Sequence, residues 1–266
     1  MADDVYRTIT NRASVRRYQE REVPREIIEG LALAGQQAPF TGQMYSFIVT
    51  TDETKRKRLA ELLGALVLQA PVFMLICVDF RKLEKFIAYR GRQNQATDIG
   101  LLFLGIQDAS YAGQNIVLAA EEAGLGSCFL GAAPFVADEL AALFNLPERV
   151  YPLVGLVLGY PAERPSPRPR IPAKACLFWD SYHDLTEADV AEAMSVMDAG
   201  LIREGYYAKL KARIPPAAEE SAGATDPVGY DKYGWSEHVS RKYGVHGGAM
   251  TSGVLEQLGR QGIHVK

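Results

Sequence analysis

The chain has 266 residues, enough for one large domain or two small ones, and 48% of them are hydrophobic and can bury a substantial core. Its 29 basic and 32 acidic residues leave a net charge of −3, which excludes a general attraction to nucleic acid or to an anionic membrane. Three cysteines without a Cys-x-x-Cys pair argue against a disulfide framework, an acidic start argues against a secretory signal, and no apolar run is long enough to span a bilayer. We therefore expect a globular, cytoplasmic protein.

The first predicted element is a helix that begins at Pro24 and ends near Gly35, because apolar residues between them recur at helical spacing. An irregular loop follows and runs to Met44. A strand and then a charged helix are expected over Tyr45–Thr50 and Thr54–Leu63. The run Val72–Phe80 is continuously apolar, which is typical of a strand covered on both faces.

The longest predicted element is a helix over Thr97–Ala123, about 40 Å long at 1.5 Å per residue. Its apolar surface is wider than one face, which predicts that it runs through the core or lies in a subunit interface. Gly124 is a plausible left-handed stop. A strand, a helix and a buried strand are then expected over Ser127–Leu130, Asp138–Phe144 and Tyr151–Leu158.

The last third of the chain has a different amino-acid composition. The proline-rich run Pro161–Pro172 cannot be helical and predicts an extended connector. A helix is expected next, then a loose loop, then an aromatic and polar tail with two short helical patterns, over Thr186–Lys211, Ile214–Pro227 and Tyr230–Lys266. We expect a core over residues 1–185 and a helical extension over 186–266 that wraps a partner subunit or caps a site.

Two basic clusters suggest a phosphate site. Arg12, Ser14 and Arg16 alternate, so in extended backbone their side chains point to one side. Arg168 and Arg170 follow the proline-rich run and could close on the same anion, since charge-assisted hydrogen bonds favour a phosphomonoester. The alternative is two solvated basic surfaces that never meet.

Other motifs are weaker. The loop Ala38–Ser46 could hold a flat heteroaromatic ring or be an ordinary connection, and the segment Cys128–Pro134 could let a ligand approach the backbone or simply pack tightly. The glycines near residue 126 follow a helix and open a strand, which is the wrong order for a dinucleotide fingerprint. The four histidines lack metal-ligand spacing, so no metal is expected.

The order of motifs is more specific than any one of them. They are Arg-x-Ser-Val-Arg-x-Tyr from Arg12, the Ala-Pro-x-x-Gly-Gln loop, Val-Asp-Phe at residue 78, Glu-Ala-Gly-Leu-Gly before residue 127, Phe-Leu-Gly-Ala at residue 129, Asn-Leu-Pro-Glu, the apolar run at residue 152 and Arg-Pro-Arg-Ile-Pro. This set resembles the FMN-dependent nitroreductase and flavin reductase family, especially its larger, NADPH-using, oxygen-insensitive branch. The likeness covers about two thirds of the chain.

The resemblance implies an α+β fold with a mostly antiparallel sheet flanked by helices, in an intertwined homodimer that holds FMN at its interface. Ala38, Pro39 and Phe40 replace serines that many relatives have, which changes the expected contacts to the flavin pyrimidine edge. The implied cofactor-binding residues are Arg12, Ala13, Ser14 and Arg16; Ala38, Pro39, Phe40 and Gln43; Phe129, Leu130, Gly131 and Ala132; and Arg168 and Arg170.

The implied activity is NAD(P)H-dependent reduction of nitroaromatics, quinones or free flavins by ping-pong hydride transfer through FMN, with no catalytic side chain. NADPH or NADH would be the donor, and Lys209, Lys211 and Arg213 could favour NADPH through its 2′-phosphate or be ordinary surface charge. The expected partners are a second copy of the chain and small aromatic electron acceptors, with no nucleic acid and no membrane. The alternatives are a nonenzymatic FMN-binding or redox-sensing protein, and a flavin-destructase or dehalogenase relative.

Overall fold

The computed structural model describes residues 3–214, 228–245 and 247–265. Contacts between Cα atoms divide the chain into two compact units, the first made of residues 1–166 and 253–266 and the second of residues 167–252. The chain thus leaves the first unit once and returns to it for its last residues. The predicted boundary near residue 185 between core and extension stays a prediction.

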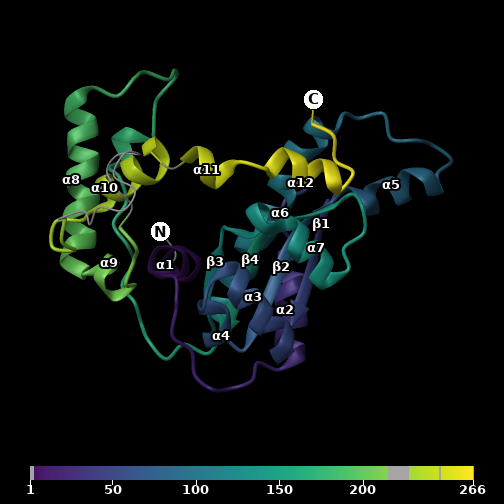
Figure 1. Cartoon of the computed structure of the whole chain (residues 1–266), viewed down its shortest axis with the longest axis horizontal. Helices are drawn as coiled ribbons and strands as arrows, with labels where there is room; N and C mark the ends of the chain where they lie inside the picture. Colours follow the sequence, from purple (N-terminus) through teal and green to yellow (C-terminus); the bar gives the residue numbers. More distant parts are fainter. Residues whose placement is uncertain (1–2, 215–227, 246, 266) are drawn as a thin grey trace. The chain divides into compact units, whose positions relative to one another are not determined.

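The first unit is built around an antiparallel sheet with the strand order β1-β2-β4-β3 (Figure 1). The strands are β1 (Tyr45–Thr50), β2 (Val72–Asp79), β3 (Gly126–Leu130) and β4 (Val150–Gly159). Tyr45 pairs with Val78 between β1 and β2, and the β2–β4 register shifts between Ile76 and Cys77. All four strands lie where the sequence predicts them, and every residue of β2 is buried.

Helices cover both faces of this sheet. Successive β2 residues point to opposite faces, so Met74 and Ile76 join a core cluster with residues of α2 and α6, while Phe73 and Leu75 join a second cluster with residues of α3 and α7. The helical elements of the first unit are α1 (Asp3–Asn11), α2 (Arg25–Gln36), α3 (Glu53–Leu63), α4 (Leu66–Gln69), α5 (Phe80–Tyr89), α6 (Asp98–Glu122), η1 (Ala133–Val136), α7 (Ala137–Phe144) and α12 (Val254–Arg260).

The long helix α6 is confirmed within one residue at each end, with Thr97 accepting a hydrogen bond from the Gly100 amide as its N-cap. One face is buried in the core, and α2 packs closely on it, because a Cβ on Gly35 would lie 2.8 Å from the Ile116 side chain. The opposite side exposes Phe103 and Tyr111 at 64% and 48% of their surface. The helix is therefore buried on one face only within its own chain. By contrast, α1, α4 and α5 lie where the sequence predicts no element.

The second unit contains η2 (Ala173–Ala175), α8 (Glu187–Glu204), α9 (Tyr206–Lys209), α10 (Trp235–Val239), the π-helical η4 (Ser240–Val245) and α11 (Gly247–Thr251). No helix or strand lies between Pro161 and Pro172 apart from an isolated bridge at Pro161, as predicted for the connector. The single helix predicted to Lys211 is wrong, because Gly205 adopts a left-handed φ of 63° that ends α8. The predicted loose loop lies, apart from Ile214, outside the described residues.

The C-terminal segment is fastened to the first unit by polar contacts. The Gln257 side-chain oxygen accepts a hydrogen bond from the Ala137 amide, and Arg260 pairs with Asp138 at 2.6 Å. Arg149 donates to the Gly262 carbonyl and also pairs with Asp98 at 2.7 Å. These contacts hold α12 against α7 and the start of α6.

Candidate functional site

The basic segment after α1 lies alongside β3. Ser14 forms a parallel bridge with Ser127, and the Val15 amide donates to the Ser127 carbonyl at 2.9 Å. The Val15 side chain is buried against Gly126, where an added Cβ would lie 2.6 Å from it. Ser14 and Arg16 are only partly buried, as the alternation of extended backbone requires when Val15 points inward. The structure thus confirms the extended backbone predicted for Ser14 and Arg16.

A carboxylate and a phenol also fix this segment. Glu163 accepts hydrogen bonds from the amides of Arg16 and Arg17, at 2.7 and 3.2 Å. The Tyr18 hydroxyl donates to the Val15 carbonyl at 2.8 Å, and burial raises the pKa of this phenol well above its usual range. The guanidinium of Arg16 donates to the Ser14 carbonyl at 3.1 Å. The backbone that carries the predicted phosphate ligands is therefore held in place before any ligand binds.

The predicted flavin loop is organised by a buried aspartate that the sequence analysis missed. Asp108 of α6 is 1% exposed, and its carboxylate accepts hydrogen bonds from the amides of Thr41, Gly42 and Met44, at 2.6, 2.9 and 3.0 Å. Gln43 between these donors has a φ of 49°, in the left-handed region. One carboxylate thus fixes the curvature of the loop, much as a nest of amides binds an anion. An acidic residue in the middle of an apolar helix, away from both helix ends, is the signal that could have revealed it.

Other predicted members of this loop differ in exposure. The side chain of Ala38 is buried, while Pro39 and Phe40 are exposed, Phe40 to 56%. Ala38 therefore serves the core, and only its backbone could contact a ligand. Phe40 presents an open aromatic ring beside the Asp108-bound turn.

The end of β3 places the third group of predicted residues near the first. Phe129 is 38% exposed, and a Cβ on Gly113 of α6 would lie 3.7 Å from its ring. Gly131 and Ala132 are exposed, and a Cβ on Gly131 would meet nothing within 4 Å. Because Ser14 bridges to the same strand, the structure brings the basic segment and the Phe129–Ala132 segment together on β3.

Arg168 and Arg170 belong to the second unit. The Arg168 guanidinium lies 4.0 Å from the centre of the Tyr206 ring, and Pro169 fits against Gly200 of α8. Arg170 donates to the carbonyls of Arg168 and Pro169. These contacts shape the connector within its own unit. The convergence of both arginines with Arg12 and Arg16 stays a prediction.

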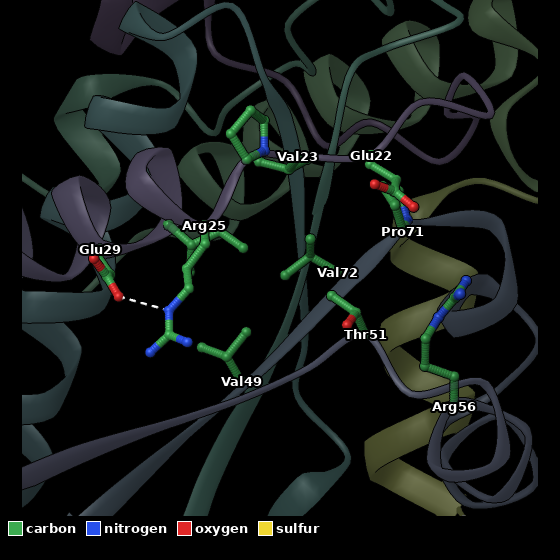
Figure 2. A pocket seen from close by; sticks show the side chains of 11 residues that line it. Glu22, Val23, Arg25, Glu29, Val49, Thr51, Arg56, Pro71 and Val72 are labelled. Carbon is green, nitrogen blue, oxygen red and sulfur yellow. Dashed lines mark hydrogen bonds and ion pairs between the residues drawn. The ribbon is translucent and has the colours of Figure 1, made fainter.

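A pocket of about 880 Å³ lies elsewhere in the first unit, at the start of α2 and the ends of β1 and β2 (Figure 2). The valine side chains Val49 and Val72 supply apolar surface, and Arg25 pairs with Glu29 at 2.8 Å along its rim. Arg56 also contributes to the lining and donates to the backbone carbonyls of residues 67, 68 and 70. The described residues that line this pocket include none of those predicted to bind the cofactor.

The residues on β3 and in the loop fit the predicted cofactor in kind. Two arginines and a hydroxyl suit a phosphate, Phe129 and Phe40 offer exposed aromatic surface to a flat ring, and the open space at Gly131 allows a close approach to the backbone. Among the described residues, no group of histidine, cysteine, aspartate or glutamate side chains could hold a metal ion. Within the same residues, no helix is long and apolar enough to cross a membrane.

Comparison with known proteins identifies the family of the chain. The model of the nitroreductase family matches residues 9–160. The chain is 37% identical to a Cr(VI) reductase of Pseudomonas sp. over 66% of this chain and 74% of that protein, and 35% identical to an NAD(P)H-dependent FMN reductase of Bacillus subtilis over 68% and 75%. The structure of B. megaterium NfrA2 superposes with a TM-score of 0.83 over 100% of both chains at 27% identity. The chain therefore belongs to the nitroreductase family and is an oxidoreductase.

Proposed function

We propose that the protein binds FMN and uses NADPH or NADH to reduce small aromatic acceptors, namely nitroaromatics, quinones or free flavins. The observation that carries this proposal is the pairing of the basic segment, through Ser14 and Val15, with Ser127 of β3, the strand that ends in Phe129 and Leu130. The FMN reductase of Bacillus subtilis and the other relatives support the same chemistry.

The predicted residues would bind different parts of FMN. Arg12, Ser14 and Arg16 would hold the phosphate, and Arg168 and Arg170 would close on it or on the ribityl chain. The turn on Asp108 would present Gln43 to the polar edge of the ring, and backbone amides near Gly131 would face its reactive side. FMN held there would supply the two-electron redox chemistry between nucleotide and acceptor, so that no side chain would need to act as an acid, base or nucleophile. Ala13, Ala38, Pro39 and Leu130 would contribute packing.

For a nitro compound, the overall reaction is a two-electron reduction to the nitroso compound. NADPH gives up two electrons and one proton, and a second proton comes from water. The nitro group takes up both electrons and both protons, one oxygen leaves as water, and a nitroso product remains. Because the nucleotide and the acceptor would occupy the same place beside the flavin ring in turn, the kinetics should be ping-pong.

We also propose that the protein acts as a homodimer and that residues 186–266 wrap the partner or cap the site. The large apolar side chains exposed on α6 support this, because Phe103, Ile106 and Tyr111 would otherwise face water. Sedimentation velocity should show a dimer at micromolar concentration. A monomer that retains flavin and activity would contradict the proposal. The NADPH preference proposed for Lys209, Lys211 and Arg213 fails if replacing all three leaves NADPH affinity unchanged.

The decisive experiment on activity is anaerobic stopped-flow mixing of the purified, yellow protein with NADPH or NADH. We expect rapid bleaching of bound flavin and reoxidation by nitrofurazone or menadione. Bound flavin that neither nucleotide reduces faster than free flavin would indicate a sensing or storage protein. A colourless protein that does not take up FMN would refute the proposed function.

Residue roles are tested by the affinity for FMN. Replacing both Arg12 and Arg16 by glutamine should raise the Kd by at least about a hundredfold, since each charge-assisted hydrogen bond is worth about 1.5–3 kcal/mol and 1.4 kcal/mol is tenfold. Arg17→Gln is the matched control, because this neighbouring side chain is 80% exposed and points away with the alternation of the backbone. Equal Kd values for the double variant and the control would refute the assigned roles.

A further inference from the structure

A second pocket, of about 450 Å³, lies on the first unit between the start of α5, β1 and the turn from α7 to β4. Its lining differs from that of the pocket in Figure 2, because it is both cationic and aromatic. The lining residues that matter are Arg81, Lys82, Lys85, Phe86, Phe144 and Asn145. None of them belongs to the predicted flavin site.

The charge of the pocket is positive because its one carboxylate is already engaged. Asp79 is 8% exposed, accepts a hydrogen bond from the Ser46 hydroxyl and caps α5 at the Lys82 amide. The Lys82 ammonium is directed to the Tyr45 carbonyl. Arg81 and Lys85 are exposed, and within the described part of the chain neither has a carboxylate partner. In a protein with a net charge of −3, this leaves a local excess of positive charge.

The same pocket offers flat apolar surface. Phe86 is 59% exposed, so its ring presents apolar surface to the pocket at a helix position where polar side chains are usual. The Phe144 ring stacks on Phe73, with their centroids 6.2 Å apart and their planes within 6°, which fixes its orientation. Asn145 follows it with a left-handed φ of 51° and turns the chain around the pocket. A ligand with a planar ring and one anionic group would match both features.

Glu84, the acidic residue of α5, does not neutralise this face. Glu84 pairs with Arg149 at 2.6 Å instead, together with Asp98 of α6. The two cations at residues 81 and 85 are one helical turn apart, so they lie on the same side of α5. They can therefore act on one anionic group.

We propose that this pocket binds a small aromatic carboxylate, with its anionic group at Arg81 and Lys85 and its ring against Phe86 and Phe144. The two exposed cations provide modest attraction, and the aromatic side chains add apolar burial. The site does not depend on the proposed flavin chemistry, because its residues are outside the predicted cofactor contacts.

The test is isothermal titration of the full-length protein, without nucleotide, using 4-nitrobenzoate and its uncharged analogue 4-nitrobenzamide. We expect the carboxylate to bind at least about fivefold more tightly in low salt, in line with two exposed ion pairs, and the difference to shrink in 0.5 M salt, about the concentration at which exposed pairs are largely screened. Equal affinities for the two compounds would overturn the proposal.

The location is tested with matched charge variants. Arg81→Gln with Lys85→Gln should abolish the preference for the carboxylate, whereas Arg90→Gln with Arg92→Gln removes the same charge just beyond α5 and should leave it intact. Equal losses in both variants would show a general charge effect and overturn the site. The titration is repeated with saturating FMN. An unchanged Kd supports a separate pocket, while loss of binding would place the anion in the flavin site and refute the inference.

Discussion

The buried carboxylate of Asp108 provides the sharpest test of how this fold positions its loop. Asp108→Asn keeps the shape of the side chain but replaces one acceptor oxygen by a donor NH₂ group. Whichever way the new amide turns, it faces at least one of the backbone amides of Thr41, Gly42 and Met44, so one hydrogen bond becomes a donor–donor contact. The remaining bonds lose the assistance of the charge.

The expected loss in the free energy of unfolding follows from these contacts. One lost charge-assisted hydrogen bond is worth about 1.5–3 kcal/mol, and an unsatisfied buried amide adds a desolvation penalty of about 1–3 kcal/mol. We therefore expect the free energy of unfolding to fall by about 3–5 kcal/mol. For a chain of this size, that corresponds to a decrease in Tm of roughly 6–20 °C.

Urea denaturation followed by circular dichroism measures this change, with thermal melting as a second readout. Glu122→Gln is the matched control, because it removes an exposed carboxylate from the same helix. It should change stability by less than about 0.5 kcal/mol. An Asp108→Asn protein as stable as this control would refute the reasoning that the three amides depend on the carboxylate.

Three further changes test other contacts. Gly126→Ala should push the basic segment away from β3, lowering stability by about 1–3 kcal/mol and weakening FMN retention in gel filtration, whereas Gly30→Ala, where a Cβ meets nothing within 4 Å, should do neither. Arg149→Met should destabilise the fold by about 3 kcal/mol at pH 7. Arg149 lowers the pKa of Asp98, so this stability is present above the ordinary aspartate pKa and lost as pH falls through the lowered one, and urea titrations should show a flatter acid dependence in the variant. Burial lowers the pKa of His238, so this side chain takes up a proton at a higher pH in the unfolded protein than in the folded one. The free energy of unfolding should therefore fall as pH drops below about 6.5. A His238→Gln protein whose stability depends on pH just as steeply would contradict this.

Local patterns were sufficient to predict most of the helices and strands. Alternating or helical spacing of apolar residues depends only on neighbours a few positions away, which is why β1 and α6 occur where they were expected. The same reasoning failed at Gly205, because a glycine inside a helical pattern can continue the helix or end it. It also failed for α5, because its N-cap Asp79 and first residue Phe80 continue the apolar run that predicts a strand.

The candidate site required the tertiary structure. The alternation of Arg12, Ser14 and Arg16 is visible in the chain, but not its pairing with Ser127, which is more than a hundred residues away. Nor does the sequence show that Asp108 faces amides 64 to 67 residues earlier. Periodicity reports which face of an element is buried, whereas hydrogen bonds between distant segments depend on how those faces pack. Residue types and their order therefore determined the family and the chemistry, and long-range packing decided which groups meet.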